Sequence, residues 1–447
     1  MRPDAGTSKS DTKPVPQVTY VGYLRAHLGV GEAARGYIRA LASAEVSLSL
    51  LDVSSESRSQ TGDYDLVESS GVAARGQHSD LALIHVNAQE FPTILAKHAS
   101  SLRSMRRRIG IWVWETTDFP EQWADRFEML EEVWVPSRFV ATAVSLKAPC
   151  PVVVIPHAVS IPAHDATRGA FGFSDTEFLF LTQFDFLSVP ERKNPEGVIL
   201  AFKQAFSQRD AVRLVIKTMN AEYGPGTRQR LQAMAGDSRI SFIDKALADK
   251  ERYNLLAAAD CFVSLHRAEG FGLSLAEAMA MGKPVIATGW GGNLEFMDLT
   301  NSILVPYELR TLEFDAGPYP AGTRWAEPDI EAAAAAMRRV YVEPAWAEKI
   351  ATRAKHDIAR QLAPKVIGAR MKTRLELVAA RATAPDARSY GIQTAITRPS
   401  AIMSHMKYFA GMLFSQPREF SRRAWLYYQC FGLRALVRHA IHRASKA

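Results

Sequence analysis

Short apolar runs alternate with longer amphipathic stretches along most of the chain. In the first half, strand-like runs lie at residues 18–23, 81–86, 108–113, 133–136 and 151–156. The second half repeats the pattern at residues 178–182, 212–218, 240–243, 261–265 and 284–288. Strands that alternate with helical segments are typical of βαβ units and parallel sheets. The pattern therefore predicts an α/β protein with two doubly wound, Rossmann-like domains.

Helical segments are expected between these runs, and a long helical region follows the last of them. The expected helices cover residues 32–41, 195–206, 227–235, 250–258, 274–281 and 329–381. No internal repeat with a period of 20 to 50 residues is visible, which argues against solenoids and propellers.

The domain organisation follows from length and from local changes in composition. A chain of 447 residues is too long for one ordinary core. We expect a disordered leader at residues 1–16, a first domain at 17–163, a second domain at 164–383 and a tail at 384–447. The leader is polar and has no apolar segment of the kind that a secretory signal needs.

The overall composition is that of a soluble globular protein, with 47% hydrophobic and 23% charged residues. No stretch approaches the roughly 18 uninterrupted apolar residues needed to span a bilayer. The three cysteines, Cys150, Cys261 and Cys430, lie far apart. We therefore expect neither a disulfide framework nor a zinc site, and a cytoplasmic protein.

The net charge of +7 is concentrated at the C-terminal end. Between Lys407 and Lys446 there are eight lysines and arginines and a single acidic residue, Glu419. Cations interleaved with bulky apolar residues over 401–447 suit the surface of an anionic membrane, which would place the protein on the inner face of the cell membrane. Packing of this tail on the protein itself is an equal alternative. Nucleic-acid binding is not expected, since no recognised module accompanies the charge.

Candidate functional residues are most concentrated at residues 264–277, Ser-Leu-His-Arg-Ala-Glu-Gly-Phe-Gly-Leu-Ser-Leu-Ala-Glu. A buried strand ends near Leu265, a glycine-bearing loop follows, and a helix runs to Met281. The backbone N–H groups at the start of that helix, over Gly270, Phe271, Gly272 and Leu273, favour a phosphate.

Two carboxylates bracket this anion site. Glu269 lies on the loop at the end of the strand, where open α/β sheets bind ligands, and Glu277 follows two helical turns later. An ionised carboxylate only accepts hydrogen bonds, so sugar and ribose hydroxyls are suitable partners. The residues therefore indicate a sugar nucleotide. The alternative is that Glu269 caps a loop and Glu277 is a solvated helix residue.

The segment from Glu269 to Glu277, followed by Ala-Met-Ala-Met-Gly-Lys-Pro-Val-Ile-Ala, resembles the E-x7-E signature of the group 1 glycosyltransferases (glycosyltransferase family 4). This resemblance implies a retaining enzyme of the GT-B fold, with two Rossmann-like domains facing across a cleft. It implies that Glu269 contacts the transferred sugar and that Glu277 contacts the nucleotide ribose. Phe271, Gly272 and Leu273 would offer backbone donors to the donor substrate.

A second matching segment runs from Phe184 to Pro195 and contains Arg192 and Lys193. By resemblance this basic pair binds the donor diphosphate, and Lys217 at the end of a strand is a further candidate. An arginine that the family often carries earlier in this segment is absent, and Arg192 is its possible replacement. The alternative is that Arg192 and Lys193 only cap the helix that begins at Pro195.

In the first half, Ile109 to Pro120 resembles the acceptor domain of some bacterial members. Many relatives carry a histidine where this strand ends, and here Glu115 takes that place. Glu115 is expected either to orient or deprotonate an acceptor hydroxyl, or to lie at the edge of a packing cluster of Trp112, Trp114 and Phe119. Three further residues are expected to face the cleft from this domain: Gly29, Gly31 and His157. The alternative is that the two glycines only form a turn and that His157 is a structural residue.

No metal or other cofactor is expected. No D-x-D pair lies in a suitable loop, and no cluster has metal-ligand spacing. The prediction is a metal-independent hexosyltransferase that uses a nucleoside diphosphate sugar and a saccharide or lipid-linked acceptor, in surface polysaccharide or glycolipid synthesis. The alternatives are a sugar-nucleotide epimerase and a non-catalytic sugar-nucleotide-binding protein.

Overall fold

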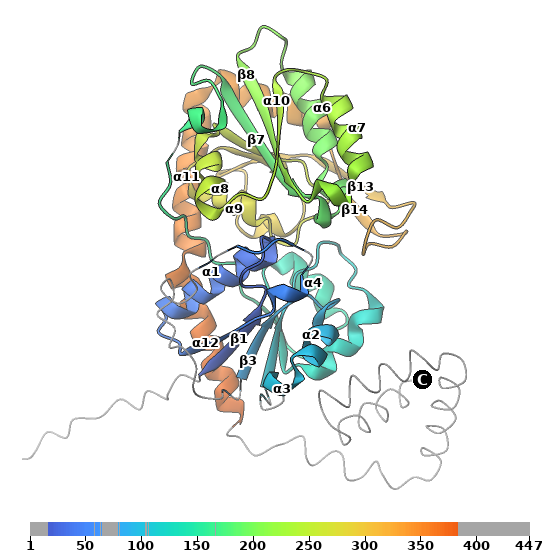
Figure 1. Cartoon of the computed structure of the whole chain (residues 1–447), viewed down its shortest axis with the longest axis vertical. Coiled ribbons are helices and arrows are strands. Elements are labelled where there is room, and N and C mark those ends of the chain that lie inside the picture. The colour runs from blue at the N-terminus through green and yellow to red at the C-terminus, as the bar shows by residue number, and fades with distance from the viewer. Residues whose placement is uncertain are drawn as a thin grey trace, which may run out of the picture.

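The computed structural model describes residues 17–57, 59–62, 64, 79, 81–102, 105, 107–165 and 167–382. These residues form two α/β domains stacked along the long axis of the molecule (Figure 1). Each domain is built on a parallel six-stranded sheet, so the predicted pair of doubly wound domains is confirmed. The predicted leader (1–16) and tail (384–447) lie outside the described residues, and so does the proposed membrane contact of residues 401–447.

The sheet of the first domain has the strand order β2-β1-β3-β4-β5-β6. Its strands are β1 (Val18–Gly22), β2 (Leu48–Asp52), β3 (Leu81–His85), β4 (Arg107–Ile111), β5 (Glu132–Val135) and β6 (Val152–Val154). Its helices are α1 (Gly29–Ser43), α2 (Phe91–Lys97), α3 (Ala99–Leu102) and α4 (Arg138–Ser145). Strands β1 and β3 are buried along their whole length, as expected for central strands of a parallel sheet covered on both faces.

The sheet of the second domain has the order β12-β11-β10-β7-β8-β9. Its strands are β7 (Phe178–Asp185), β8 (Val212–Met219), β9 (Ile240–Asp244), β10 (Cys261–Ser264), β11 (Val285–Thr288) and β12 (Ile303–Val305). Its helices are α5 (Pro190–Lys193), α6 (Pro195–Ala205), α7 (Pro225–Ala235), α8 (Asp249–Ala258), α9 (Leu273–Ala280) and α10 (Ile330–Val342). The strands and helices expected here from the sequence are present, with ends that differ by a few residues.

Proline divides the long helical region that the sequence predicted at 329–381. The structure has three helices there: α10, α11 (Pro344–Leu362) and α12 (Pro364–Ala382). Pro344 and Pro364 each occupy the first position of their helix, where the missing N–H costs nothing. The periodic pattern continues through both breaks, which is why it indicated a single region.

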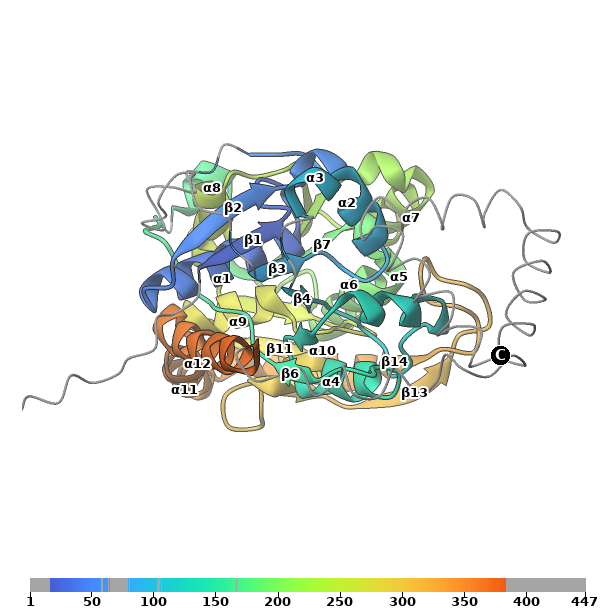
Figure 2. The same cartoon turned by 90° about the horizontal axis from the view of Figure 1, so that it is seen from below.

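Helix α12 returns to the first domain, although the sequence grouped it with the second. Figures 1 and 2 show it beside α1. A Cβ on Gly368 would lie 2.0 Å from the carbonyl oxygen of Ala40, so only glycine permits this approach. Arg374 also pairs with the buried carboxylate of Glu132 on β5. The last described helix therefore belongs structurally to the first domain.

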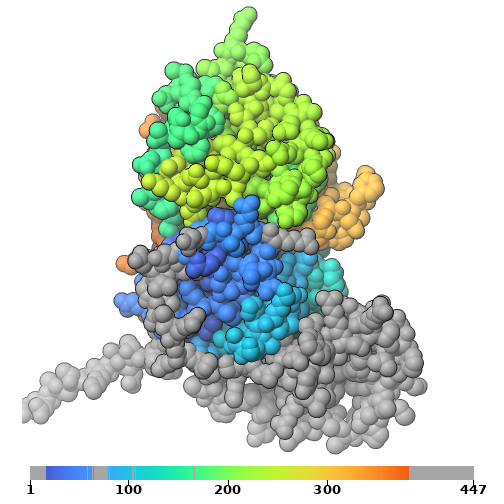
Figure 3. Space-filling model, viewed as in Figure 1, coloured from blue at the N-terminus to red at the C-terminus, as the bar shows by residue number. Residues whose placement is uncertain are grey.

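A β-hairpin protrudes from the second domain beside the junction of the two domains (Figure 3). It is formed by β13 (Tyr307–Thr311) and β14 (Arg324–Pro328), and its connecting loop reaches the first domain. The sequence analysis did not anticipate this hairpin, which lacks a regular apolar alternation. No helix in the described part of the chain is long and apolar enough to cross a bilayer.

Candidate active site

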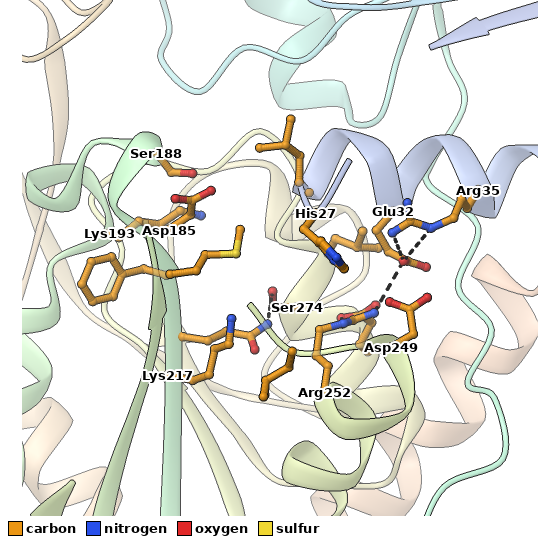
Figure 4. A pocket seen from close by; sticks show the side chains of 18 of the residues that line it. His27, Glu32, Arg35, Asp185, Ser188, Lys193, Lys217, Asp249, Arg252 and Ser274 are labelled. Carbon is orange, nitrogen blue, oxygen red and sulfur yellow. Dashed lines mark hydrogen bonds and ion pairs between the residues drawn. The ribbon is translucent and has the colours of Figure 1, made fainter. Parts of the chain in front are cut away.

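The junction of the two domains contains a cleft of about 840 Å³, the open solvent at its mouth included, which we call the donor cleft (Figure 4). The second domain lines it with Lys193, Lys217, Leu273, Ser274, Arg252 and Glu277 among others. The first domain contributes Gly29, Glu32 and Arg35 from α1. The cleft lies where the β1–α1 and β10–α9 loops face each other, at the carboxyl edges of two parallel sheets.

The β10–α9 loop has the geometry expected of an anion site. Gly272 precedes α9 with φ of 84°, a left-handed conformation that favours glycine. Leu273 and Ser274 begin the helix and line the donor cleft. Their N–H groups belong to the first turn, where no intrahelical acceptor exists, and the positive end of the helix dipole lies there as well.

Glu269 is held at the centre of a cationic pair. Lys193 forms an ion pair with one of its carboxylate oxygens, and Nη1 of Arg192 lies 3.5 Å from the other. Burial favours the neutral carboxyl, but the charges of Lys193 and Arg192 outweigh burial and lower the pKa of Glu269 to about 2. Glu269 is therefore an ionised hydrogen-bond acceptor at neutral pH.

The basic pair does not cap helix α6, contrary to the simpler interpretation of that segment. The cap is Asn194, whose side chain accepts a hydrogen bond from the N–H of Gly197. Arg192 is buried and donates to the carbonyl of Ala268, whereas Lys193 lines the donor cleft. Arg192 thus holds the loop that carries Glu269 through the carbonyl of Ala268. Lys193 is the member of the pair that lines the cleft.

Lys217 is a buried cation with no fixed partner. It lies on β8 beside Gln183 of β7 and is 6% exposed. Within the described residues its ammonium group makes no hydrogen bond or ion pair. Burial is the main cause that lowers the pKa of Lys217 to about 8, and the nearby charge of Arg252 lowers it further. A buried ammonium lining a cleft is well placed to bind an anionic ligand.

Glu277 is 3% exposed, so the interpretation of Glu277 as a solvated helix residue is wrong. Its Oε2 accepts a hydrogen bond from Nη1 of Arg252 at 2.6 Å, and its Oε1 accepts one from the hydroxyl of Tyr253 at 2.9 Å. Arg252 and Tyr253 were missed by the sequence analysis. They lie in an expected helix, but no spacing rule relates α8 to a carboxylate on α9.

Glu115 lies between the two domains, away from the donor cleft. Its Oε2 accepts a hydrogen bond from the hydroxyl of Tyr319 in the hairpin loop, and Nη2 of Arg192 is 3.9 Å from Oε1. Arg192 therefore lies between Glu115 and Glu269. The expected aromatic cluster is also present, with Trp112 stacked on Phe119 at 5.9 Å and Trp114 packed against Tyr319 at 5.2 Å. Glu115 is thus at the edge of a packing cluster and also close to the Glu269 group.

Of the three other residues expected to face the cleft from the first domain, only Gly29 lines it. Gly29 lines the donor cleft at the start of α1. Gly31 lies two residues further along the same helix, where a Cβ would be 2.5 Å from the carbonyl oxygen of Ala26. His157 is 4% exposed and its ring contacts Phe271 at 4.7 Å. Burial lowers the pKa of His157 to about 3, so the imidazole is neutral.

The Glu269 loop makes close contact with the first domain. A Cβ on Gly270 would lie 2.4 Å from Cγ1 of Val113 and 2.8 Å from the carbonyl oxygen of Trp114. Ser137 of the first domain donates a hydrogen bond of 2.7 Å to the carbonyl of Gly270. The donor-side loop is therefore positioned partly by the opposite domain. In the part of the chain that the structure describes, no three His, Cys, Asp or Glu residues are grouped to hold a metal ion.

Comparisons with known proteins agree with this arrangement. Residues 179–313 match the family model described as Glycosyl transferases group 1, which confirms the resemblance over most of the second domain. HepE from Anabaena, solved in complex with UDP and glucose, is similar in structure with a TM-score of 0.59 and 16% identity. That match covers 81% of this chain and all (100%) of HepE.

Two further structures are similar over almost the same range. Sucrose-phosphate synthase from Thermosynechococcus elongatus has a TM-score of 0.59 and 17% identity, covering 82% of this chain and 100% of that chain. A glycosyltransferase from Rickettsia africae ESF-5 has a TM-score of 0.59 and 15% identity, covering 81% and 98%. No curated protein sequence matches significantly. The chain therefore has the GT-B fold, and residues 179–313 of its second domain are similar to the group 1 glycosyltransferases.

Proposed function

We propose that the protein is a retaining glycosyltransferase that moves a hexose from a nucleoside diphosphate sugar to a saccharide or lipid-linked acceptor. The observation that carries the proposal is the arrangement of Glu269, Lys193 and Lys217 around the start of α9. It combines an ionised hydrogen-bond acceptor with cations and free N–H groups, the chemistry that a phosphorylated sugar requires. The complex of HepE with UDP and glucose is consistent with a ligand of this kind.

In this proposal the donor diphosphate lies between Lys193, Lys217 and the first turn of α9. The bond between the anomeric carbon and the phosphate oxygen breaks, and the diphosphate gains negative charge. Fixed cations and N–H groups stabilise that charge more in the transition state than in the ground state, which accelerates the step. These side chains supply the positive charge at the diphosphate, so the proposed reaction is metal-independent.

Glu269 is proposed to accept hydrogen bonds from the hydroxyls of the transferred sugar, and Glu277 from those of the ribose. The acceptor hydroxyl approaches from the first domain, near Glu115. The acceptor oxygen bonds to the anomeric carbon on the face of the sugar that the diphosphate leaves, and its proton passes to the departing diphosphate oxygen. This outcome retains the anomeric configuration. We further propose a role in surface polysaccharide or glycolipid synthesis at the cytoplasmic face of the membrane.

The test is a thermal-shift screen of the full-length protein with a panel of nucleoside diphosphate sugars. A specific donor stabilises the folded state by mass action, by about 2.7 kcal/mol at one hundred times its dissociation constant. Lys217→Met should lose about half of this stabilisation, whereas Arg230→Gln, on α7 outside the cleft, should keep it. If no donor in the panel stabilises the wild-type protein, the proposal is wrong.

The same donor then separates enzyme classes. A transferase releases free nucleoside diphosphate when a suitable acceptor is added. An epimerase converts the donor into a second sugar nucleotide without any acceptor, and a binding protein leaves it unchanged. Chromatography of the nucleotides distinguishes the three outcomes.

A further inference from the structure

Arg252 joins two carboxylates that belong to different domains. Its Nη1 donates to Oε2 of Glu277 at 2.6 Å, within the second domain. Its Nη2 lies 3.6 Å from Oε2 of Glu32 on α1 of the first domain. Figure 4 shows the Arg252 side chain extending from α8 toward Glu32. The guanidinium group of Arg252 therefore bridges the cleft between Glu277 of the second domain and Glu32 of the first.

Glu32 is held firmly by its own helix. Arg35 approaches Oε2 at 2.8 Å and Arg39 approaches Oε1 at 2.9 Å. Burial favours the neutral form of Glu32, but Arg252, Arg35 and Arg39 together lower its pKa to about 2. Glu32 is thus a fixed negative charge that attracts Arg252, and both of its oxygens are already occupied.

Glu277 has fewer cationic partners than Glu32. Among the described residues, Arg252 is the only cation that donates a hydrogen bond to it. Arg252 and Tyr253 of α8 donate hydrogen bonds to Glu277, and the nearby charge of Glu32 on α1 also acts on it. The other charged or titratable groups that line the cleft are His27, Arg35, Tyr64, Asp185, Lys193, Lys217 and Asp249. Helix α9 carries no other titratable residue. Burial raises the pKa of the Glu277 carboxyl, and Arg252 is the largest influence that lowers it.

The opposing effects of burial and Arg252 decide whether Glu277 is ionised, and this affects ligand binding. An ionised carboxylate has about four lone-pair sites, so Glu277 can keep both present hydrogen bonds and still accept from ribose hydroxyls. A protonated carboxyl would present a donor in place of an acceptor. Without the positive charge of Arg252, burial would favour that protonated form.

We propose that Arg252 is a positioning residue of the donor site, which fixes Glu277 as a charged acceptor for the nucleotide ribose and is itself anchored across the cleft by Glu32. The inference rests on the proposed function, since it assumes a nucleotide at Glu277. Arg252 acts through Glu277 and through the relative position of the two domains.

The test is calorimetric titration of nucleoside diphosphates (uridine, guanosine, adenosine and thymidine) into full-length protein, from about pH 6 to about pH 9. Arg252→Gln should weaken binding at least about tenfold at neutral pH, as expected for loss of a charge-assisted contact. The affinity should recover as the pH rises, because the raised pKa of Glu277 is then passed and the carboxyl ionises. Arg252→Lys keeps a positive charge and should keep the wild-type pH profile.

Lys217 also titrates in this range, so a second comparison assigns the recovery. In a Glu277→Gln background nothing at position 277 can ionise, and adding Arg252→Gln should then produce no pH-dependent recovery. Arg230→Gln also removes an arginine–glutamate ion pair, to Glu196 at 2.7 Å, but on the surface outside the cleft, and should bind like wild type.

The outcomes separate this inference from the proposed function. If the wild-type protein binds none of the diphosphates, the proposed function fails and the inference fails with it. If it binds one and Arg252→Gln binds equally well at every pH, only the inference fails. Recovery that persists in the Glu277→Gln background assigns the effect to a group other than Glu277 and also overturns the inference. Should Arg252→Gln not fold, an altered pH profile in Arg252→Lys contradicts it.

Discussion

The two walls of the donor cleft hold their charges in different ways. On the wall of the first domain, Glu32 is saturated by Arg35 and Arg39 from the same helix. On the wall of the second domain, Lys217 has no partner among the described residues, and Lys193 is shared with Glu269 alone. Lys217 is influenced by the charges of Asp185 and Asp244 but forms no ion pair with either. A cation without an ion-pair partner is available to a ligand, and a carboxylate that already binds two arginines is not. The wall of the second domain therefore binds the ligand, and the wall of the first domain positions the groups that bind it.

The largest expected effect is loss of the Glu269–Lys193 pair. Glu269→Ala or Lys193→Ala should reduce sugar transfer at least about 100-fold, as removal of a transition-state contact commonly does. Release of nucleoside diphosphate under saturating donor measures the change in kcat. Wild-type turnover in both variants would falsify the assignment of the second domain as the binding wall.

An intermediate effect is expected at Lys217. Lys217→Met should weaken binding of a nucleoside diphosphate about tenfold, since one buried charge contact is lost. The pKa of Lys217 is lowered to about 8, so the ammonium is charged below that pH and loses its proton above it. Wild-type affinity should consequently fall as the pH rises past about 8.

The Lys217→Met variant should lack that alkaline decline, and calorimetric titration across the pH range measures both quantities. An alkaline decline of equal size in wild type and variant would assign the titration to another group. Such a result would give no support to the view that Lys217 is more available to a ligand than the paired charges of the first domain.

The smallest expected effect concerns the contact between the two walls. Gly270→Ala places a methyl group against Val113 and the backbone of Trp114, and should lower the free energy of unfolding by about 1 kcal/mol. Gly226→Ala, in α7, meets no atom within 4 Å and has no special backbone angle, so it is a matched control. Alanine favours a helix over glycine, and this control should be neutral or slightly stabilising.

Chemical denaturation of the two alanine variants gives both values. Equal stability of Gly270→Ala and Gly226→Ala would mean that the Glu269 loop is not positioned by the first domain.

The sequence predicted those parts of the molecule that depend on local order. Alternating apolar runs indicated both sheets, because a strand buried on both faces must be apolar along its length. The Glu269–Glu277 spacing and the glycines of the loop are also local features, and the loop and helix α9 formed as expected. The resemblance of two separate segments predicted that Lys193 and Glu269 belong to one donor site, but it did not predict their ion pair.

Long-range pairings were not predictable from the same patterns. Arg252 meets Glu32 across 220 residues of chain, and Tyr319 meets Glu115 from a hairpin without a clear signature. Neither pair has a spacing rule, since their proximity depends on how two sheets are stacked. Helix α12 was assigned to the second domain for the same reason, because its apolar residues do not reveal which partner they cover.

The return of α12 to α1 has a practical consequence for dividing the protein. A fragment spanning residues 164–382 would leave the apolar residues of α12 without helix α1, whose Ala40 they approach. The complementary fragment would expose α1 in the same way. Such halves should associate when expressed together, each completing the other, and should be poorly soluble when expressed alone.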